Sequence, residues 1–313
     1  MELKKIIKSR ELTVGLVMIG LIVFFSLSSE RFLTTNNIKN ILLQVSSIGV
    51  ASIGMTMIII TGGIDVSAGS ILGIVAVTLG KAATNGFPAW LSIILGILVG
   101  LALGSVNASF IALLGIPPII VTLGMMSLLR SLAYTFLGGR WIASLPGAVR
   151  WMGLGKILNV PVPIWLTIIL VAYFSYFMRY RPLGRYIYAV GNSLEAARVS
   201  GVDTKRILFF VYALAGLMYG IAGAIVVGRA GIVQTNTGNN FELQVIAATV
   251  LGGTSILGGK GTIVGSILGS LLVAVLSNGL ILLNVPALTE GLIIGVLILG
   301  SVAIDVIKNR GEE

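Results

Sequence analysis

The chain of 313 residues contains neither cysteine nor histidine. Without cysteine it can form no disulfide bond and offers no thiolate nucleophile. Without histidine it lacks the commonest general base and the commonest metal ligand. Charged residues make up only 10% of the sequence, whereas soluble domains contain about 25%. We therefore expect no catalytic residues, no bound metal or cofactor, and no soluble fold.

Apolar sequence is abundant instead. Hydrophobic residues account for 56% of the chain, and the mean hydropathy is +1.05. Runs long enough to cross about 30 Å of hydrocarbon recur along the whole sequence. They predict an all-α, polytopic membrane bundle of about ten spans, in a single transmembrane domain over residues 1–313 with both termini in the cytoplasm. The predicted spans are Leu12–Leu27, Leu42–Thr61, Val66–Ala83, Ala89–Leu113, Pro117–Leu137, Pro163–Met178, Ile207–Val227, Leu243–Leu257, Thr262–Leu283 and Ala287–Val306.

Two of these runs leave an alternative open. The first follows basic residues and precedes Ser26 and Ser28, as in a cleaved signal peptide, but it is long enough to be an uncleaved span. The eighth, 243–257, is short and could be a re-entrant segment.

Lysine and arginine gather in three clusters, and positive loops stay in the cytoplasm. The clusters precede the first span, follow the sixth and follow the tenth, so an even number of crossings separates them and they share one side. The net charge of +10 is thus explained by topology, and we expect no nucleic-acid partner. Segment 138–162, with Arg140, Arg150 and Lys156, must be outside, which fits the charge rule less well. The cluster residues are Lys4, Lys5, Lys8, Arg10, Arg179, Arg181, Arg185, Arg198, Lys205, Arg206, Lys308 and Arg310.

Small residues recur at every fourth position in three spans. Such residues let helix backbones approach closely in lipid, where packing drives association. The pattern predicts tight helix crossings in a compact bundle. The residues are Gly96, Gly100, Gly104 and Ala108, then Gly216 and Gly220, then Gly265 and Gly269.

The stretch VLGGTSILGGKGT, at 250–262, looks at first like a phosphate-binding loop. That motif needs glycine, four residues, then glycine, lysine and a serine or threonine. Counted back from Lys260, the first position is Thr254, and the hydroxyl position is Gly261. Two of the four fixed positions fail, so we expect no ATP site here.

The same stretch echoes an earlier one. GGIDVSAGSILG from Gly62 and GGKGTIVGSILG from Gly258 share paired glycines and GSILG at identical spacing. Repeated halves are common in transporters. In the predicted topology both copies run in the same direction, so the echo is either a duplication or a chance match in a glycine-rich chain.

The largest cytoplasmic loop, 184–207, has the pattern of a short docking helix. Residues 193–200 can form two helical turns, with Asn192 or Ser193 as N-cap, Glu195 in the first turn and Gly201 as terminator. Such a helix could dock into a groove of a soluble partner or lie on anionic lipid.

Four segments are distinctive together: 54–73 (GMTMIIITGGIDVSAGSILG), 115–132 (GIPPIIVTLGMMSLLRSL), the loop at 184–207, and 239–269. They resemble, in order, the ribose-type sugar permeases of ATP-binding-cassette importers, which share a family with branched-chain amino-acid permeases. The resemblance covers the chain nearly end to end. Within that family the outer segment 137–149 looks closer to permeases for autoinducer-2 or rhamnose than to those for ribose.

The resemblance implies an importer in the bacterial cytoplasmic membrane. Two permease subunits, identical or related, would form the pathway. Two cytoplasmic ATPases would hydrolyse the ATP, and an extracytoplasmic binding protein would deliver a sugar-like solute. By carry-over, the loop residues that couple to the ATPase are Gly191, Asn192, Glu195, Ala196, Ala197, Ser200 and Gly201.

Five polar side chains inside apolar runs are candidates for lining the pathway, because unsatisfied polar groups are costly in lipid. Hydrogen bonds between helices would explain each of them equally well. Asp65 is expected near the cytoplasmic face, where it or Ser67 could instead cap the third span. The candidates are Asp65, Asn107, Thr122, Arg130 and Asn278.

Two further acids, Glu242 and Glu290, are expected at the outer ends of the eighth and tenth spans. They would either mark the water interface or lie where a binding protein docks.

Two rival classes remain. A secondary transporter or channel would need acidic or histidine relays, or a charged ring, within the membrane, and Asp65 alone is a poor basis for one. An intramembrane enzyme would need a nucleophile and a base, or metal ligands.

Overall fold

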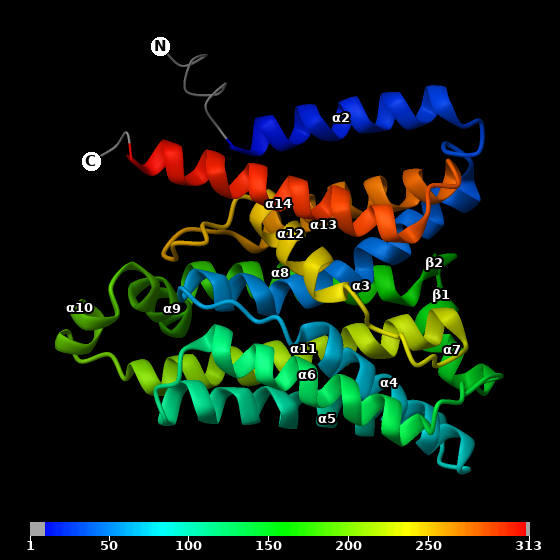
Figure 1. Ribbon diagram of the computed structural model, residues 1–313, viewed down its shortest axis with the longest axis horizontal. Coiled ribbons are helices and arrows are strands. Elements are labelled where there is room, and N and C mark those ends of the chain that lie inside the picture. The colour runs from blue at the N-terminus through cyan, green and yellow to red at the C-terminus, as the bar shows by residue number, and fades with distance from the viewer. Residues whose placement is uncertain (1–9, 311–313) are drawn as a thin grey trace.

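The computed structural model describes the backbone of residues 10–310 and the side chains of residues 15–286 and 289–300. Lys4, Lys5 and Lys8 lie outside the described residues. All ten apolar runs form helices, which confirms the all-α membrane bundle (Figure 1). They are α2 (Arg10–Ser28), α3 (Thr35–Ile60), α4 (Ala68–Thr84), α5 (Ala89–Ala108) with the π-helical turn η1 (Ser109–Leu113), α6 (Pro118–Leu137), α8 (Val162–Tyr180), α11 (Thr204–Ala230), α12 (Phe241–Leu251), α13 (Ile263–Leu282) and α14 (Ala287–Arg310).

The remaining elements lie at the two ends of the bundle. One end carries α9 (Pro182–Asn192) and α10 (Leu194–Val199), together with the start of α2 and the end of α14 (Figure 1). The opposite end carries α7 (Gly147–Leu154) and a hairpin of β1 (Lys156–Ile157) and β2 (Val160–Pro161). The arrangement agrees with the predicted even numbers of crossings, so we call the α9–α10 end cytoplasmic and the α7 end outer.

Within the described residues, six helices are long and apolar enough to cross a membrane, and four shorter apolar helical segments accompany them. Two predicted boundaries were wrong for local reasons. Helix α3 begins at Thr35 rather than Leu42, because the Thr34 side chain accepts a hydrogen bond from the amide of Asn37 and caps the helix. Helix α12 stops at Leu251, because Gly253 has a φ of 94° that a helix cannot continue through.

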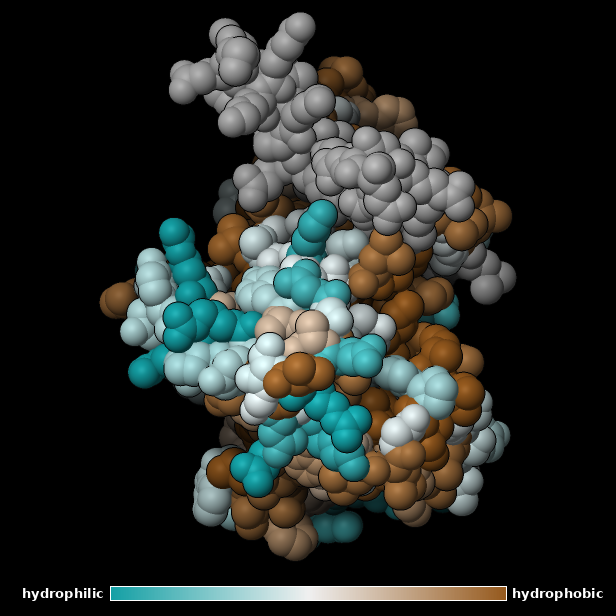
Figure 2. Space-filling view, turned by 90° about the vertical axis from the view of Figure 1, so that its left-hand side faces the viewer, coloured by the Kyte–Doolittle hydropathy of each residue, from teal (hydrophilic) through white to brown (hydrophobic). Residues whose placement is uncertain are grey.

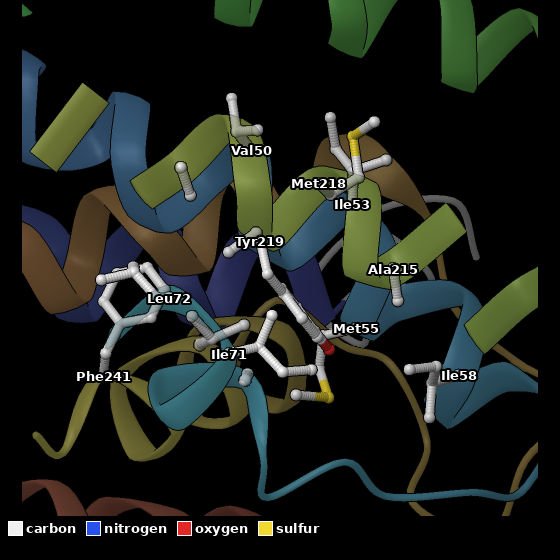
Figure 3. Close-up of a cluster of buried hydrophobic side chains, with 14 of the residues drawn as sticks. Val50, Ile53, Met55, Ile58, Ile71, Leu72, Ala215, Met218, Tyr219 and Phe241 are labelled. Carbon is white, nitrogen blue, oxygen red and sulfur yellow. The ribbon is translucent and has the colours of Figure 1, made fainter. Parts of the chain in front are cut away.

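Helix α3 is the centre of the bundle. Every residue from Val45 to Ile60 is buried, which requires other helices on all sides. Figure 3 shows the core there, where side chains of α3, α4, α11 and α12 interdigitate and Tyr219 of α11 reaches across toward Met55 and Ile71. Hydroxyl pairs join α3 to α13, with Thr56 donating to Ser266 at 2.6 Å.

The predicted small-residue crossings are present. At the crossing of α5 and α11, Gly104 and Gly216 meet so closely that a Cβ atom added to Gly104 would lie 2.7 Å from the Cα of Gly216. On α13, Gly265 and Gly269 pack in the same way against the backbone of Gly252 and Ala248 at the end of α12. These contacts leave no room for side chains, so glycine sets the distance between the helices.

Candidate functional site

Helix α12 is too short to cross the membrane, since 11 residues extend only about 17 Å. The preceding segment, 231–240, is not helical and descends along α4. Its residue Val233 packs against Gly80, its Thr237 carbonyl faces Gly73, and its Gly238 contacts Gly69. The chain therefore crosses here as a non-helical segment made largely of turns, followed by a half-length helix. Both are buried against glycines, where protein can surround the backbone.

Helix α4 also starts inside the bundle. After α3 ends, residues 61–67 run back into the interior without helical structure. At their end the Asp65 carboxylate accepts hydrogen bonds from the amide and the hydroxyl of Ser67, at 2.8 and 2.6 Å. Asn107 of α5 donates to the same hydroxyl at 2.9 Å. These bonds fix the first turn of α4.

The expected position of Asp65, near the cytoplasmic face, was wrong. Its carboxyl group is 1% exposed and lies beside the hydroxyl of Tyr219, halfway along the 27-residue helix α11. The misplacement arose because residues 61–67 look like a surface loop in the sequence but re-enter the bundle. Asp65 therefore lies deep in the membrane.

The expected position of Glu242, at the outer end of the eighth span, was also wrong. Glu242 is 6% exposed rather than at the outer surface, because segment 231–240 carries it inward before α12 begins. One carboxylate oxygen pairs with Arg130 of α6 at 3.4 Å, and the other contacts Gly69 in the first turn of α4. Two helix starts, each attractive to negative charge, thus meet beside two carboxylates.

Four of the five candidate pathway residues gather around this meeting point. The hydroxyl of Thr122 donates to the carbonyl of Ile64 at 3.3 Å, so it lies beside Asp65. We call the group the polar cluster. Only Arg130 reaches the surface, with 37% of its side chain exposed. The polar cluster consists of Asp65, Ser67, Asn107, Thr122, Arg130 and Glu242.

Asn278 is not in the polar cluster. Its side-chain amide exchanges two hydrogen bonds with that of Asn37 in α3, at 2.8 and 2.9 Å. Both amides are buried. The contact joins α3 and α13. For this residue, a hydrogen bond between helices explains the polar side chain, as the alternative to a pathway role predicted. Glu290, expected at the water interface, also bonds within the bundle, to Ser277 at 2.6 Å and Gln244 at 2.8 Å.

Replacing Asn278 by leucine is expected to destabilise the protein by about 1 to 3 kcal/mol. The buried amide of Asn37 loses both hydrogen bonds to Asn278 and keeps only the one that it donates to the Phe32 carbonyl. The double variant N37L/N278L should recover part of this loss, since neither polar group remains. Thermal unfolding in detergent measures both. Equal losses for the single and double variants would show that the amide pair does not matter.

The exposed face of α6 carries polar side chains that the sequence analysis missed. Ser127, Ser131 and Tyr134 are exposed and recur at spacings of four and three, so they share a face with Arg130. That helical spacing was the available signal. The face turns away from the described residues and offers hydroxyl groups at membrane depth.

The cytoplasmic loop contains the predicted docking helix. The Ser193 side chain caps α10 by accepting from the amide of Ala196 at 3.2 Å, and Glu195 lies in the first turn. The chain then turns at Gly201, whose φ is 84°. Of the predicted coupling residues, Asn192, Glu195, Ala196, Ser200 and Gly201 are exposed, whereas Ala197 is buried and Gly191 is half-buried.

Two apolar side chains on α10 were missed. Leu194 is 49% exposed and Val199 is 84% exposed, although α10 lies at the far cytoplasmic end of the molecule (Figure 1). Figure 2 looks onto this end and shows mainly hydrophilic residues there, with hydrophobic residues on the flanks. Exposed apolar side chains among charged ones are typical of a protein-docking surface.

A cavity of 590 Å³ opens beside this helix. Its lining includes Leu194 and Lys205 of the loop, Pro117 before α6, and Gly63 and Tyr212. The backbone of Gly63 touches the Tyr212 hydroxyl. The cavity therefore extends from the cytoplasmic loop toward the polar cluster.

Known proteins resemble this chain over nearly its whole length. The family model described as "Branched-chain amino acid transport system / permease component" matches residues 37–302. The chain belongs to this permease family. The permease is 37% identical to the Ribose import permease protein RbsC of Escherichia coli (strain K12), over 93% of this chain and 92% of that protein. It is 35% identical to the Autoinducer 2 import system permease protein LsrC of Yersinia pseudotuberculosis serotype O:3 (strain YPIII), over 97% of this chain and 86% of that protein.

No solved structure matches the permease. The family match agrees with the resemblance read from the four sequence segments. Together with the helices, it establishes a multi-pass membrane permease whose relatives are transport components rather than enzymes.

Proposed function

We propose that this permease is the membrane subunit of an ATP-driven importer for a sugar or sugar-like solute in the bacterial cytoplasmic membrane. The two relatives are named for import of ribose and of autoinducer 2, which supports a small polyhydroxylated solute. The whole chain, residues 1–313, acts as one transmembrane domain. ATP is hydrolysed by a separate subunit, and an extracytoplasmic protein delivers the solute.

The observation that carries the proposal is the exposed helix α10. Its apolar residues Leu194 and Val199 are exposed at the cytoplasmic end of the bundle, where no other described part of the chain covers them. A capped helix with an apolar tip and basic neighbours fits a groove on a soluble protein. We therefore expect the ATPase to dock at α10 and to contact Glu195, Ala196 and Gly201.

The exposed face of α6 supports a second permease copy or a related subunit. Arg130 lies well inside α6 and is 37% exposed in the single chain. A guanidinium group at this depth is costly in lipid and faces protein or water instead. The face with Ser127, Arg130 and Ser131 thus borders the route between two subunits, and its hydroxyl groups suit a sugar.

The buried members of the polar cluster act on this route indirectly. Asp65, Asn107 and Thr122 are at most 1% exposed, so they do not contact a solute in this conformation. They fix the start of α4, against which Glu242 packs at Gly69, and Glu242 in turn pairs with Arg130. The cavity beside α10 then provides the route's cytoplasmic end.

The test of the proposed function uses Val199→Asp in tagged permease purified gently from membranes. A carboxylate at the apolar tip is expected to reduce co-purification of the ATPase about tenfold or more, as loss of an interface anchor does. Leu158→Asp, on the outer hairpin, is the matched control because Leu158 is 83% exposed. That variant should retain the ATPase.

Two results would contradict the proposed function. Equal retention of an ATPase by the Val199→Asp variant and the unmodified permease would exclude α10 as the docking site. Solute uptake by vesicles that contain the permease alone, without ATP, would instead indicate a secondary transporter or channel.

A further inference from the structure

The coupling loop, residues 184–207, contacts the membrane helices at a point where backbone atoms touch directly. We call this contact, made by Ile60, Gly191 and Gly259, the junction. Gly191 of α9 touches the carbonyl oxygen of Ile60, the last residue of α3. The amide of Gly259 donates to that same carbonyl at 2.9 Å. A Cβ atom at position 191 would overlap the Ile60 carbonyl and lie 2.7 Å from the Gly259 nitrogen. Three separate segments thus touch with no side chain between them.

The junction brings together the two echoing glycine turns of the sequence. Gly62 and Gly258 have φ values of 80° and 89°. A Cβ atom on Gly258 would lie 3.3 Å from the Cα of Gly62 and 2.8 Å from the carbonyl oxygen of Gly191. The two turns therefore lie side by side, and the coupling loop contacts both.

Side chains of α9 strengthen this contact. The hydroxyl of Tyr188 donates to the carbonyl of Gly261 at 2.8 Å, and Asn192 packs against Gly259. Burial raises the pKa of the Tyr188 hydroxyl, so it stays protonated and remains a donor. The turn at 252–262 is thus held to α9 by a hydrogen bond as well as by packing.

Each turn leads directly to the polar cluster. From Gly62, the chain continues through residues 63 and 64 to Asp65. From the other turn, α12 leads back to Glu242. Because Gly269 packs directly against Ala248, the end of α12 and the start of α13 move together. A displacement of the junction would therefore reach both carboxylates.

We propose that Tyr188 and Gly191 are positioning residues that transmit movement of the coupling loop, through the two glycine turns, to the polar cluster. This inference rests on the proposed function, because it assumes an ATPase that moves α10. It assigns to the glycine-rich stretch 252–262 the role of receiving that movement. The sequence echo is then explained by two turns that share one mechanical task.

The test measures movement at the exposed face of α6 and does not need the solute. The chain has no cysteine, so a single Ser127→Cys substitution places one thiol on the exposed face of α6. N-ethylmaleimide labels it in permease purified with its ATPase, either without nucleotide or trapped with ATP and vanadate. In this background the labelling rate should differ about threefold or more between the two states.

Adding Tyr188→Phe should remove most of that difference, while ATP hydrolysis and retention of the ATPase persist. A general loss of folding would abolish hydrolysis as well. Loss of the labelling difference with hydrolysis retained therefore shows that only transmission has failed. Tyr186→Phe is the matched control, because Tyr186 is also on α9 but is 42% exposed. Gly191→Ala, whose Cβ atom would overlap the Ile60 carbonyl, should also remove most of the labelling difference, whereas Gly20→Ala, with open space around it, should have no effect.

Three results would overturn the inference. An unchanged labelling difference in both Tyr188→Phe and Gly191→Ala would show that the junction transmits nothing. Loss of the ATPase from Tyr188→Phe would make Tyr188 a docking residue. If the Ser127→Cys background retains its ATPase but shows no nucleotide-dependent difference, the route along α6 in the proposed function fails, and the inference fails with it.

Discussion

A valine at position 216 is expected to destabilise the permease severely and to lower its yield. Gly216 packs directly against the backbone of Gly100 and Gly104, and an added Cβ atom would lie 2.6 Å from the Cα of Gly104. Backbone atoms on both sides cannot rotate away as a side chain could. The helices α5 and α11 would have to separate, which also opens the core around Tyr212 and Tyr219.

The expected cost is about 3 kcal/mol or more, at the upper end for overpacked cores. This is a large fraction of the total stability of a typical domain. The measurement is the yield of monodisperse protein in detergent and its unfolding temperature. Gly20→Val is the control, since nothing lies within 4 Å of a Cβ atom at Gly20. A Gly216→Val protein that purifies and unfolds like the unmodified permease would show that the crossing is looser than the structure indicates.

This crossing was predictable from the sequence, as were the helices themselves. Long apolar runs and glycines at every fourth position specify spans and close contacts, and neither depends on distant partners. The cap and terminator of α10, Ser193 and Gly201, were also predictable, because capping is local. Leu194 and Val199 could have been noticed as the two large apolar residues of the predicted docking helix, 193–200.

The depth of the polar cluster was not predictable in this way. Asp65 follows a glycine pair, and Glu242 follows two asparagines, so both look like residues at the ends of spans. Their burial depends on segments 61–67 and 231–240 entering the bundle without helical structure. Hydropathy along the chain does not reveal that, and the partner of Glu242, Arg130, is 112 residues away.

This separation along the sequence explains why Arg130 was predicted as a pathway candidate without a partner. Once the pair is known, its two members have different tasks. Glu242 is buried and acts inside the bundle, while Arg130 is partly exposed and lies at the edge of the proposed route. Stability and transport should therefore respond differently to changes in the pair.

Replacing Arg130 by methionine is expected to destabilise the permease by about 2 to 3 kcal/mol. The loss comes from Glu242, whose charge stays buried without a counter-charge. The expected loss lies below the usual range for a buried pair because 37% of the Arg130 side chain is exposed. The double variant R130M/E242Q removes both charges and should recover most of the stability, as unfolding temperatures would show.

Uptake by cells that carry the complete importer should separate the two tasks. The R130M/E242Q protein is expected to fold but to transport about tenfold more slowly than the unmodified permease, because the polar face of α6 loses the charge of Arg130. Glu242→Gln alone keeps Arg130 on that face, and its neutral amide can still accept a hydrogen bond, so it should retain most of the transport. Normal uptake by the double variant would make the ion pair purely structural and would remove Arg130 from the proposed route.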